Sequence, residues 1–188
     1  MKARLLAAVV VLVPVFPSVV AAVHAACASG PAAGCTQTDA HQSSLRFAET
    51  VSDPDTIFTW LWKHGPQTAV ADFGDPPSGT AYVLCLYDQS ARPQPVYAAP
   101  ANEQAWRAFA TGFIYVVRGP HPLRRLVLRA GNEGKTSLFA HGNDETVNAV
   151  LPFTAPVRVQ LQASNGRCWE STFPTPLRSD AHQFIATD

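Results

Sequence analysis

The acidic residues that could do chemistry gather around one stretch, residues 71–88. It contains Asp72, Asp75 and Asp88 in a run of turn-forming and apolar residues. Carboxylates clustered in loops can bind Ca²⁺, which takes about six to eight oxygen ligands. No spaced Asp/Asn ligand loop is present, however, and an aspartate such as Asp75 before Pro76 is typical of a turn. We therefore expect turns at these aspartates, and neither a metal nor a cofactor.

The other candidates for acid–base chemistry are Glu170, His121 and His141. Paired with an aspartate, Glu170 could serve a glycosidase, which needs two carboxyl groups about 5 to 10 Å apart. A strand glutamate on a solvated face is the simpler interpretation. Both histidines are expected to be exposed loop residues, because no His-Glu-x-x-His or Gly-x-Ser-x-Gly motif accompanies them. The sequence predicts no catalytic residue, and a secreted glycan-active hydrolase is the alternative function.

Four cysteines, Cys27, Cys35, Cys85 and Cys168, follow the N-terminal apolar segment. An even number in an exported chain indicates two disulfides, and three connectivities are possible. Proximity favours Cys27–Cys35 as a local loop, which leaves Cys85 and Cys168 to join two distant strands. Zinc is disfavoured because the chain has no Cys-x-x-Cys and no His-x-x-x-His partner for one.

Residues 1–25 have the pattern of a secretory signal peptide. Lys2 and Arg4 precede an apolar run, and small residues then surround a cleavage site after Ala25. Two prolines inside the run argue against a membrane-spanning helix. A lipoprotein cleaved before Cys27 is the alternative. We expect a secreted or periplasmic protein with no transmembrane helix after cleavage.

The remaining chain divides into two parts. Residues 26–44 are small and polar and predict a flexible leader, and residues 45–188 predict a single domain. Loss of Lys2 and Arg4 with the signal peptide leaves 12 basic and 14 acidic residues. No basic run exists, which argues against a nucleic-acid partner.

The domain reads as about nine short strands separated by turn residues. Residues 157–162 alternate apolar and polar side chains, which is typical of an antiparallel strand with one solvated face. Residues 102–109 fit either a helical turn or an irregular strand. This spacing favours an all-β fold, an antiparallel β-sandwich of which a jelly roll is one form. The ten segments from which these strands are drawn are residues 45–47, 57–62, 68–73, 81–87, 96–98, 113–118, 126–129, 135–140, 157–162 and 168–173.

Trp60 and Trp62 share one face of their strand, because side chains alternate with a period of two. Exposed together, they could form a glycan-binding platform. Packing in the core is the competing interpretation, since one face of the sheet must be buried.

Several motifs together resemble a family of uncharacterised exported bacterial proteins. They are Trp-x-Trp-Lys at residues 60–63, Phe-Gly-Asp-Pro at 73–76, Leu-Cys-Leu-Tyr-Asp at 84–88 and Cys-Trp-Glu at 168–170. The resemblance spans roughly residues 55–175 and implies an exported protein, but no activity, cofactor or site residue. With the predicted export, disulfides and sandwich, it leads us to expect a non-catalytic binding or structural module of the cell envelope or extracellular space. Its partner is unknown, with a glycan or an envelope component as candidates.

Overall fold

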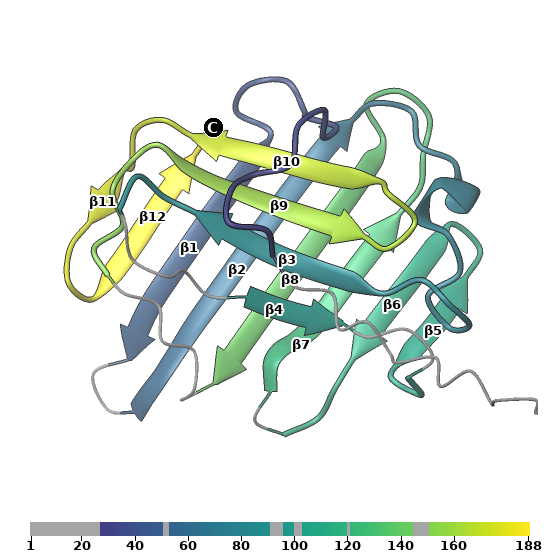
Figure 1. Cartoon of the computed structure of the whole chain (residues 1–188), viewed down its shortest axis with the longest axis horizontal. Coiled ribbons are helices and arrows are strands. Elements are labelled where there is room, and N and C mark those ends of the chain that lie inside the picture. The colour runs from purple at the N-terminus through teal and green to yellow at the C-terminus, as the bar shows by residue number, and fades with distance from the viewer. Residues whose placement is uncertain (1–26, 51–52, 91–95, 100–102, 120, 145–150) are drawn as a thin grey trace, which may run out of the picture.

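The computed structural model describes residues 27–50, 53–90, 96–99, 103–119, 121–144 and 151–188. The predicted signal peptide therefore lies outside the described residues. Two antiparallel sheets pack face to face, so the predicted all-β sandwich is confirmed. In Figure 1 the smaller sheet lies across one face of the larger sheet, and the strands of the two sheets run in different directions.

The large sheet has the strand order β11-β12-β1-β2-β8-β7-β6-β5, and the small sheet has the order β10-β9-β3-β4. The large sheet contains β1 (Ser43–Thr50), β2 (Asp53–Gly65), β5 (Trp106–Phe109), β6 (Gly112–Val116), β7 (His121–Arg129), β8 (Thr136–Asp144), β11 (Arg178–Ser179) and β12 (Gln183–Thr187). The small sheet contains β3 (Tyr82–Tyr87), β4 (Val96–Ala99), β9 (Val157–Ala163) and β10 (Cys168–Phe173).

Three local predictions need correction or completion. The described part of the chain holds twelve strands rather than about nine, because β11 and β12 were not predicted and β5 comes from a segment left ambiguous. Residues 68–73 do not form a strand, since Val70–Phe73 is a 3₁₀ helix (η1) in which the Asp72 carboxylate accepts a hydrogen bond from the Ala69 N–H at 2.8 Å. The ambiguous segment 102–109 ends in strand β5.

The core lies between the two sheets and is rich in aromatic side chains. Trp60 and Trp62 of β2 are both 0 % exposed. Their indole N–H groups donate across the core to β10, from Trp60 to the Ser171 hydroxyl at 3.0 Å and from Trp62 to the Glu170 carbonyl at 3.1 Å. The rings therefore join the sheets, as buried tryptophans do when a partner is within reach. The predicted glycan platform at Trp60 and Trp62 is wrong.

The predicted disulfide pairing is also wrong, although all four cysteines are bonded. The bonds are Cys27–Cys85 and Cys35–Cys168, with Cα–Cα distances of 5.7 and 4.7 Å. Residues 27–42, here called the N-terminal strap, cross the outer face of the small sheet from β3 to β10 (Figure 1). Because the strap runs across the strands, Cys27 lies over β3 and Cys35 lies over β10. The nearness of the two cysteines in the sequence therefore does not decide their pairing.

The N-terminal strap is fastened by hydrogen bonds as well as by disulfides. The side-chain amide of Gln160 on β9 pairs with both backbone groups of Ala32, at 2.9 and 2.8 Å. Thr36 makes a parallel bridge at the edge of β10, donating to the Cys168 carbonyl at 2.9 Å and accepting from the Glu170 N–H at 2.8 Å. The segment predicted as a flexible leader is thus a covering layer of the sandwich.

Candidate functional site

The outer face of the large sheet carries a hollow of about 520 Å³ over the strands β2, β8 and β7. Its floor is apolar and consists of Leu61, Val127 and Phe139, which are half-buried. These side chains lie in one row across the sheet, because Leu61 and Val127 both pair with Phe139 in the strand register. Ser137 lies beside this row and adds a hydroxyl.

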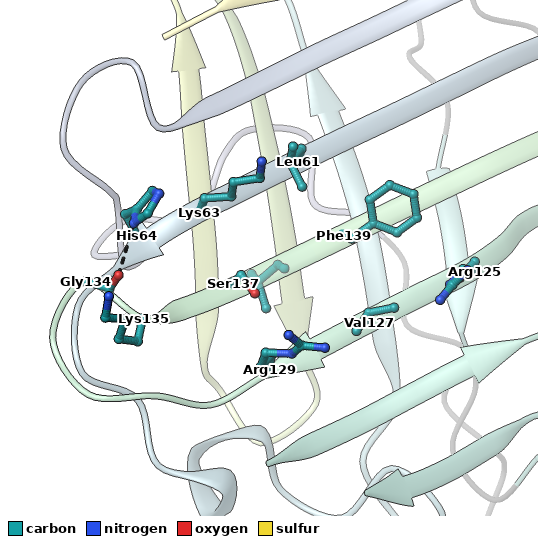
Figure 2. A pocket seen from close by; sticks show the side chains of 11 residues that line it. Leu61, Lys63, His64, Arg125, Val127, Arg129, Gly134, Lys135, Ser137 and Phe139 are labelled. Atoms are coloured by element: carbon teal, nitrogen blue, oxygen red, sulfur yellow. Dashed lines mark hydrogen bonds between the residues drawn. The ribbon is translucent and has the colours of Figure 1, made fainter. Parts of the chain in front are cut away.

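Four cationic side chains surround this floor. Lys63, Arg129 and Lys135 lie toward one end of the hollow, and Arg125 lies past Phe139 at the other (Figure 2). All four side chains are exposed. We call these residues, together with the apolar floor, the cationic face.

Simple alternation places these residues together. In β2, β7 and β8 the residues between those of the cationic face point inward and are buried, as are Trp62, Leu126 and Leu138. A strand sends successive side chains to opposite faces, so every second residue of the three strands reaches the same outer surface. At one end, the His64 ring donates from Nδ1 to the Gly134 carbonyl at 3.1 Å, which ties the end of β2 to the turn before β8.

The positive charge of the cationic face is not neutralised by a described carboxylate. The ion pairs found among the described residues are Arg167–Asp72, Arg178–Asp180 and His182–Glu49, none of which belongs to this face. Arg125 instead lies over the ring of Phe139, with 5.9 Å from the guanidinium carbon to the ring centroid. Cations of one sign around an apolar floor attract an anion with an apolar portion.

His141 borders this surface but adds no charge near neutral pH. Burial lowers the pKa of His141, and the nearby Arg124 and Arg125 lower it further, against a smaller upward effect of the Phe58 carbonyl. The ring donates from Nδ1 to that carbonyl at 3.0 Å. His141 therefore supports the edge of the cationic face as a neutral hydrogen-bond donor.

Glu170, the predicted candidate acid, lies on the other side of the molecule beneath the N-terminal strap. It is 4 % exposed. Its carboxylate accepts hydrogen bonds from the Gln37 amide at 2.8 Å and from the Gln160 amide. These contacts join the strap to β9 and β10, so the carboxylate serves the covering layer and is closed to a bulky substrate.

The aspartates Asp72, Asp75 and Asp88 hold local structure, as the turn interpretation predicts. Asp72 pairs with Arg167 at 2.7 Å, and the backbone carbonyl of Asp75 accepts the Thr80 N–H at 2.9 Å. The Asp88 carboxylate accepts the Thr154 N–H, also at 2.9 Å. In the part of the chain that the structure describes, no group of three or more His, Cys, Asp or Glu side chains could hold a metal ion.

The prediction of exposed loops at His121 and His141 is wrong, because the residues are half-buried and lie in β7 and β8 respectively. His121 is also occupied by local structure. Its ring donates from Nδ1 to the Leu123 carbonyl at 2.8 Å and lies 6.3 Å from the ring of Tyr115. Sequence reasoning thus missed the cationic face altogether. The available signal was that Lys63, Arg125 and Arg129 alternate with large apolar residues within, or directly beside, the predicted strands 57–62 and 126–129.

No protein-family model, curated protein or solved structure matches this chain. The resemblance to a family of exported bacterial proteins stays a prediction. The two disulfides suggest an oxidising, extracytoplasmic location. Within the described residues, no helix is long and apolar enough to cross a membrane.

Proposed function

We propose that this protein is an exported, non-catalytic binding module that holds a negatively charged ligand on its cationic face. One observation carries the proposal: four exposed cations surround an apolar floor and none of them forms an ion pair with a described carboxylate. Export through a cleaved signal peptide, to the periplasm or the extracellular space, belongs to the same proposal. The disulfides and the N-terminal apolar segment support it.

Folding alone gives little reason for this arrangement of charge. Like charges gathered on one face of a sheet repel one another, and acidic neighbours would relieve the repulsion. The chain has acidic residues available, since it contains 14 Asp and Glu against 14 Lys and Arg. Their absence among the residues that line the hollow favours a surface kept open for an external anion.

The geometry gives less support to the alternative, a glycan-active hydrolase. Such an enzyme needs two carboxyl groups that face each other across the scissile bond. Among the described residues that line the hollow there is no aspartate or glutamate, and Glu170 lies buried under the strap. A binding role uses the side chains that the hollow does contain.

Chromatography on an immobilised anionic polymer tests the proposal, using the purified protein with both disulfides formed. We expect the protein to be retained and to elute with rising NaCl, because ionic contacts are screened by salt. Arg129→Glu reverses one charge of the cationic face and should elute at clearly lower salt. Arg158→Glu makes the same change at an exposed position of β9, outside the hollow, and should elute like the wild type.

Two results would contradict the proposal. One is a protein that passes through the column unretained in low salt. The other is an equal shift for Arg129→Glu and Arg158→Glu, which would mean that retention reflects net charge and not the cationic face.

A further inference from the structure

We infer that the anion is an acidic polysaccharide, lying in the hollow with its sugar rings on the apolar floor and its acidic groups at the cations. This inference rests on the proposed function and names the ligand class. It depends on three features of the cationic face: the separation of the charges, the depth of the floor, and the absence of a free backbone edge.

The charges are spaced for a ligand that carries several negative groups along its length. Arg125 and Arg129 lie on the same face of β7 and are four residues apart, which separates their Cα atoms by about 13 Å. Lys63 and Lys135 extend the positive charge at the Arg129 end (Figure 2). A single small anion cannot contact both ends, whereas a chain of acidic units can.

The floor between these charges suits a sugar ring. Val127 lies between the two arginines on β7, and Phe139 pairs with it from β8. In Figure 2 the Phe139 ring is turned toward the viewer, beside Leu61 and Val127. The C–H face of a pyranose ring is apolar and can pack on such a surface, and the Ser137 hydroxyl lies within the same hollow for a sugar hydroxyl.

The relative depth of the side chains argues against an anionic membrane surface. The apolar residues of the floor are half-buried, while the cations around them are exposed. A bilayer-binding surface needs apolar side chains that project into the acyl region, ahead of the charges. Here the charged side chains project beyond the apolar ones. A slender polysaccharide chain can reach the apolar floor between them, whereas a flat bilayer surface cannot.

The sheet face also disfavours an acidic peptide and a nucleic acid. An extended peptide that binds by adding a strand needs a free sheet edge, and β2, β8 and β7 offer none because each is paired on both sides. Single-stranded nucleic acids stack successive bases on successive aromatic side chains. Of the two described rings that line the hollow, Phe139 lies on the floor, whereas the His64 imidazole at the end of β2 is held by the Gly134 carbonyl.

Binding titrations of the purified protein with both disulfides formed test the inference. The acidic polysaccharides are polygalacturonate, alginate and dextran sulfate, with methyl-esterified polygalacturonate and plain dextran as neutral controls. Poly-glutamate, phosphatidylglycerol vesicles and oligothymidylate represent the other ligand classes. We expect at least one acidic polysaccharide to bind roughly tenfold more tightly than any member of the other classes, and its neutral counterpart to lose this binding.

Two substitutions of the floor separate ring packing from charge attraction. Phe139→Leu keeps an apolar side chain but removes the flat ring, and it should weaken polysaccharide binding roughly tenfold while leaving poly-glutamate binding unchanged. Leu177→Ala, at an exposed position far along the chain, is the control and should change neither.

The outcomes separate this inference from the proposed function. If poly-glutamate, vesicles or oligothymidylate bind as tightly as the polysaccharides and Arg129→Glu weakens them all, the surface binds anions but the polysaccharide assignment is wrong. The assignment is equally wrong if Phe139→Leu leaves polysaccharide binding intact. If Arg129→Glu and Arg158→Glu behave alike toward every ligand, the proposed function itself fails.

Discussion

Two buried tyrosine hydroxyls differ in a way that stability measurements can detect. The Tyr82 hydroxyl donates to the Phe73 carbonyl at 2.5 Å, whereas the Tyr97 hydroxyl is buried without a hydrogen-bond partner among the described residues. Burial raises the pKa of both side chains. The first hydroxyl satisfies a buried acceptor, and the second is desolvated without compensation.

We therefore expect Tyr82→Phe and Tyr97→Phe to change stability in different ways. Tyr82→Phe leaves the Phe73 carbonyl without this donor and should lower the free energy of unfolding by about 1 to 3 kcal/mol. Tyr97→Phe removes an uncompensated hydroxyl and should be neutral or slightly stabilising. Urea denaturation of the two variants measures both effects, and a larger loss for Tyr97→Phe would show that its hydroxyl has a partner.

His141 makes stability depend on pH in a defined direction. Its pKa in the folded protein is lowered from 6.5, so the unfolded chain binds more protons than the folded chain between the two values. Stability should be full above about pH 6.5 and should fall as the pH drops below it, until the folded pKa is passed. Thermal unfolding of the wild type and His141→Asn across about pH 5 to 8 measures this. The variant should show a shallower dependence, and identical curves would rule out the assignment.

Sequence alternation predicts which residues share a face, but not which face is buried. Trp60 and Trp62 were correctly placed on one side of their strand. The other side of the same strand offers Ile57 and Leu61, which are also apolar, so both faces could have been the inner one. Packing against β10 decides which face is buried, because the indole N–H groups of Trp60 and Trp62 find hydrogen-bond acceptors on that strand.

The N-terminal strap is the element whose role is least visible in the sequence. Small polar residues favour disorder in isolation, and the segment has no hydrophobic periodicity that would predict an ordered structure. The strap is ordered by contacts with strands far along the chain, such as Gln160 and Cys168. Pairing of cysteines follows from that path, so it could not be derived from the spacing of the cysteines in the sequence.

Removal of each disulfide should reveal the strap's contribution. The Cys35–Cys168 bond spans 133 residues and the Cys27–Cys85 bond spans 58. In the chain-entropy model these closures stabilise the fold by about 5 and about 4 kcal/mol respectively. We expect the paired substitution Cys35→Ser with Cys168→Ser to lower the free energy of unfolding more than Cys27→Ser with Cys85→Ser. Urea denaturation gives both values, and the reverse order would mean that local contacts outweigh loop closure.

At the scale of the whole molecule, the two sheets present different outer surfaces. The small sheet is covered by the N-terminal strap, which conceals Glu170 and the Gln160 amide. The large sheet carries the cationic face, whose charges come from β2, β7 and the turn before β8. The sandwich class could be predicted from strand spacing, but this asymmetry needs the strand order, which brings Lys63 next to residues more than 60 positions later.

The charges of the cationic face should not contribute to the stability of the folded protein. Arg129→Gln removes one of several unneutralised cations, so it should leave the free energy of unfolding unchanged or raise it by a few tenths of a kcal/mol, while weakening retention on the anionic polymer. The stabilising effect should shrink as NaCl rises, because salt screens the repulsion between the exposed charges.

Arg167→Gln is the matched control, because Arg167 forms a 2.7 Å ion pair with Asp72 on the surface. Its loss should lower stability slightly, by up to about 1 kcal/mol, without changing retention. Chemical denaturation and chromatography of the two variants measure both quantities. If Arg129→Gln destabilised the protein by more than Arg167→Gln, the cation would have a structural role and the case for a surface kept open to anions would be lost.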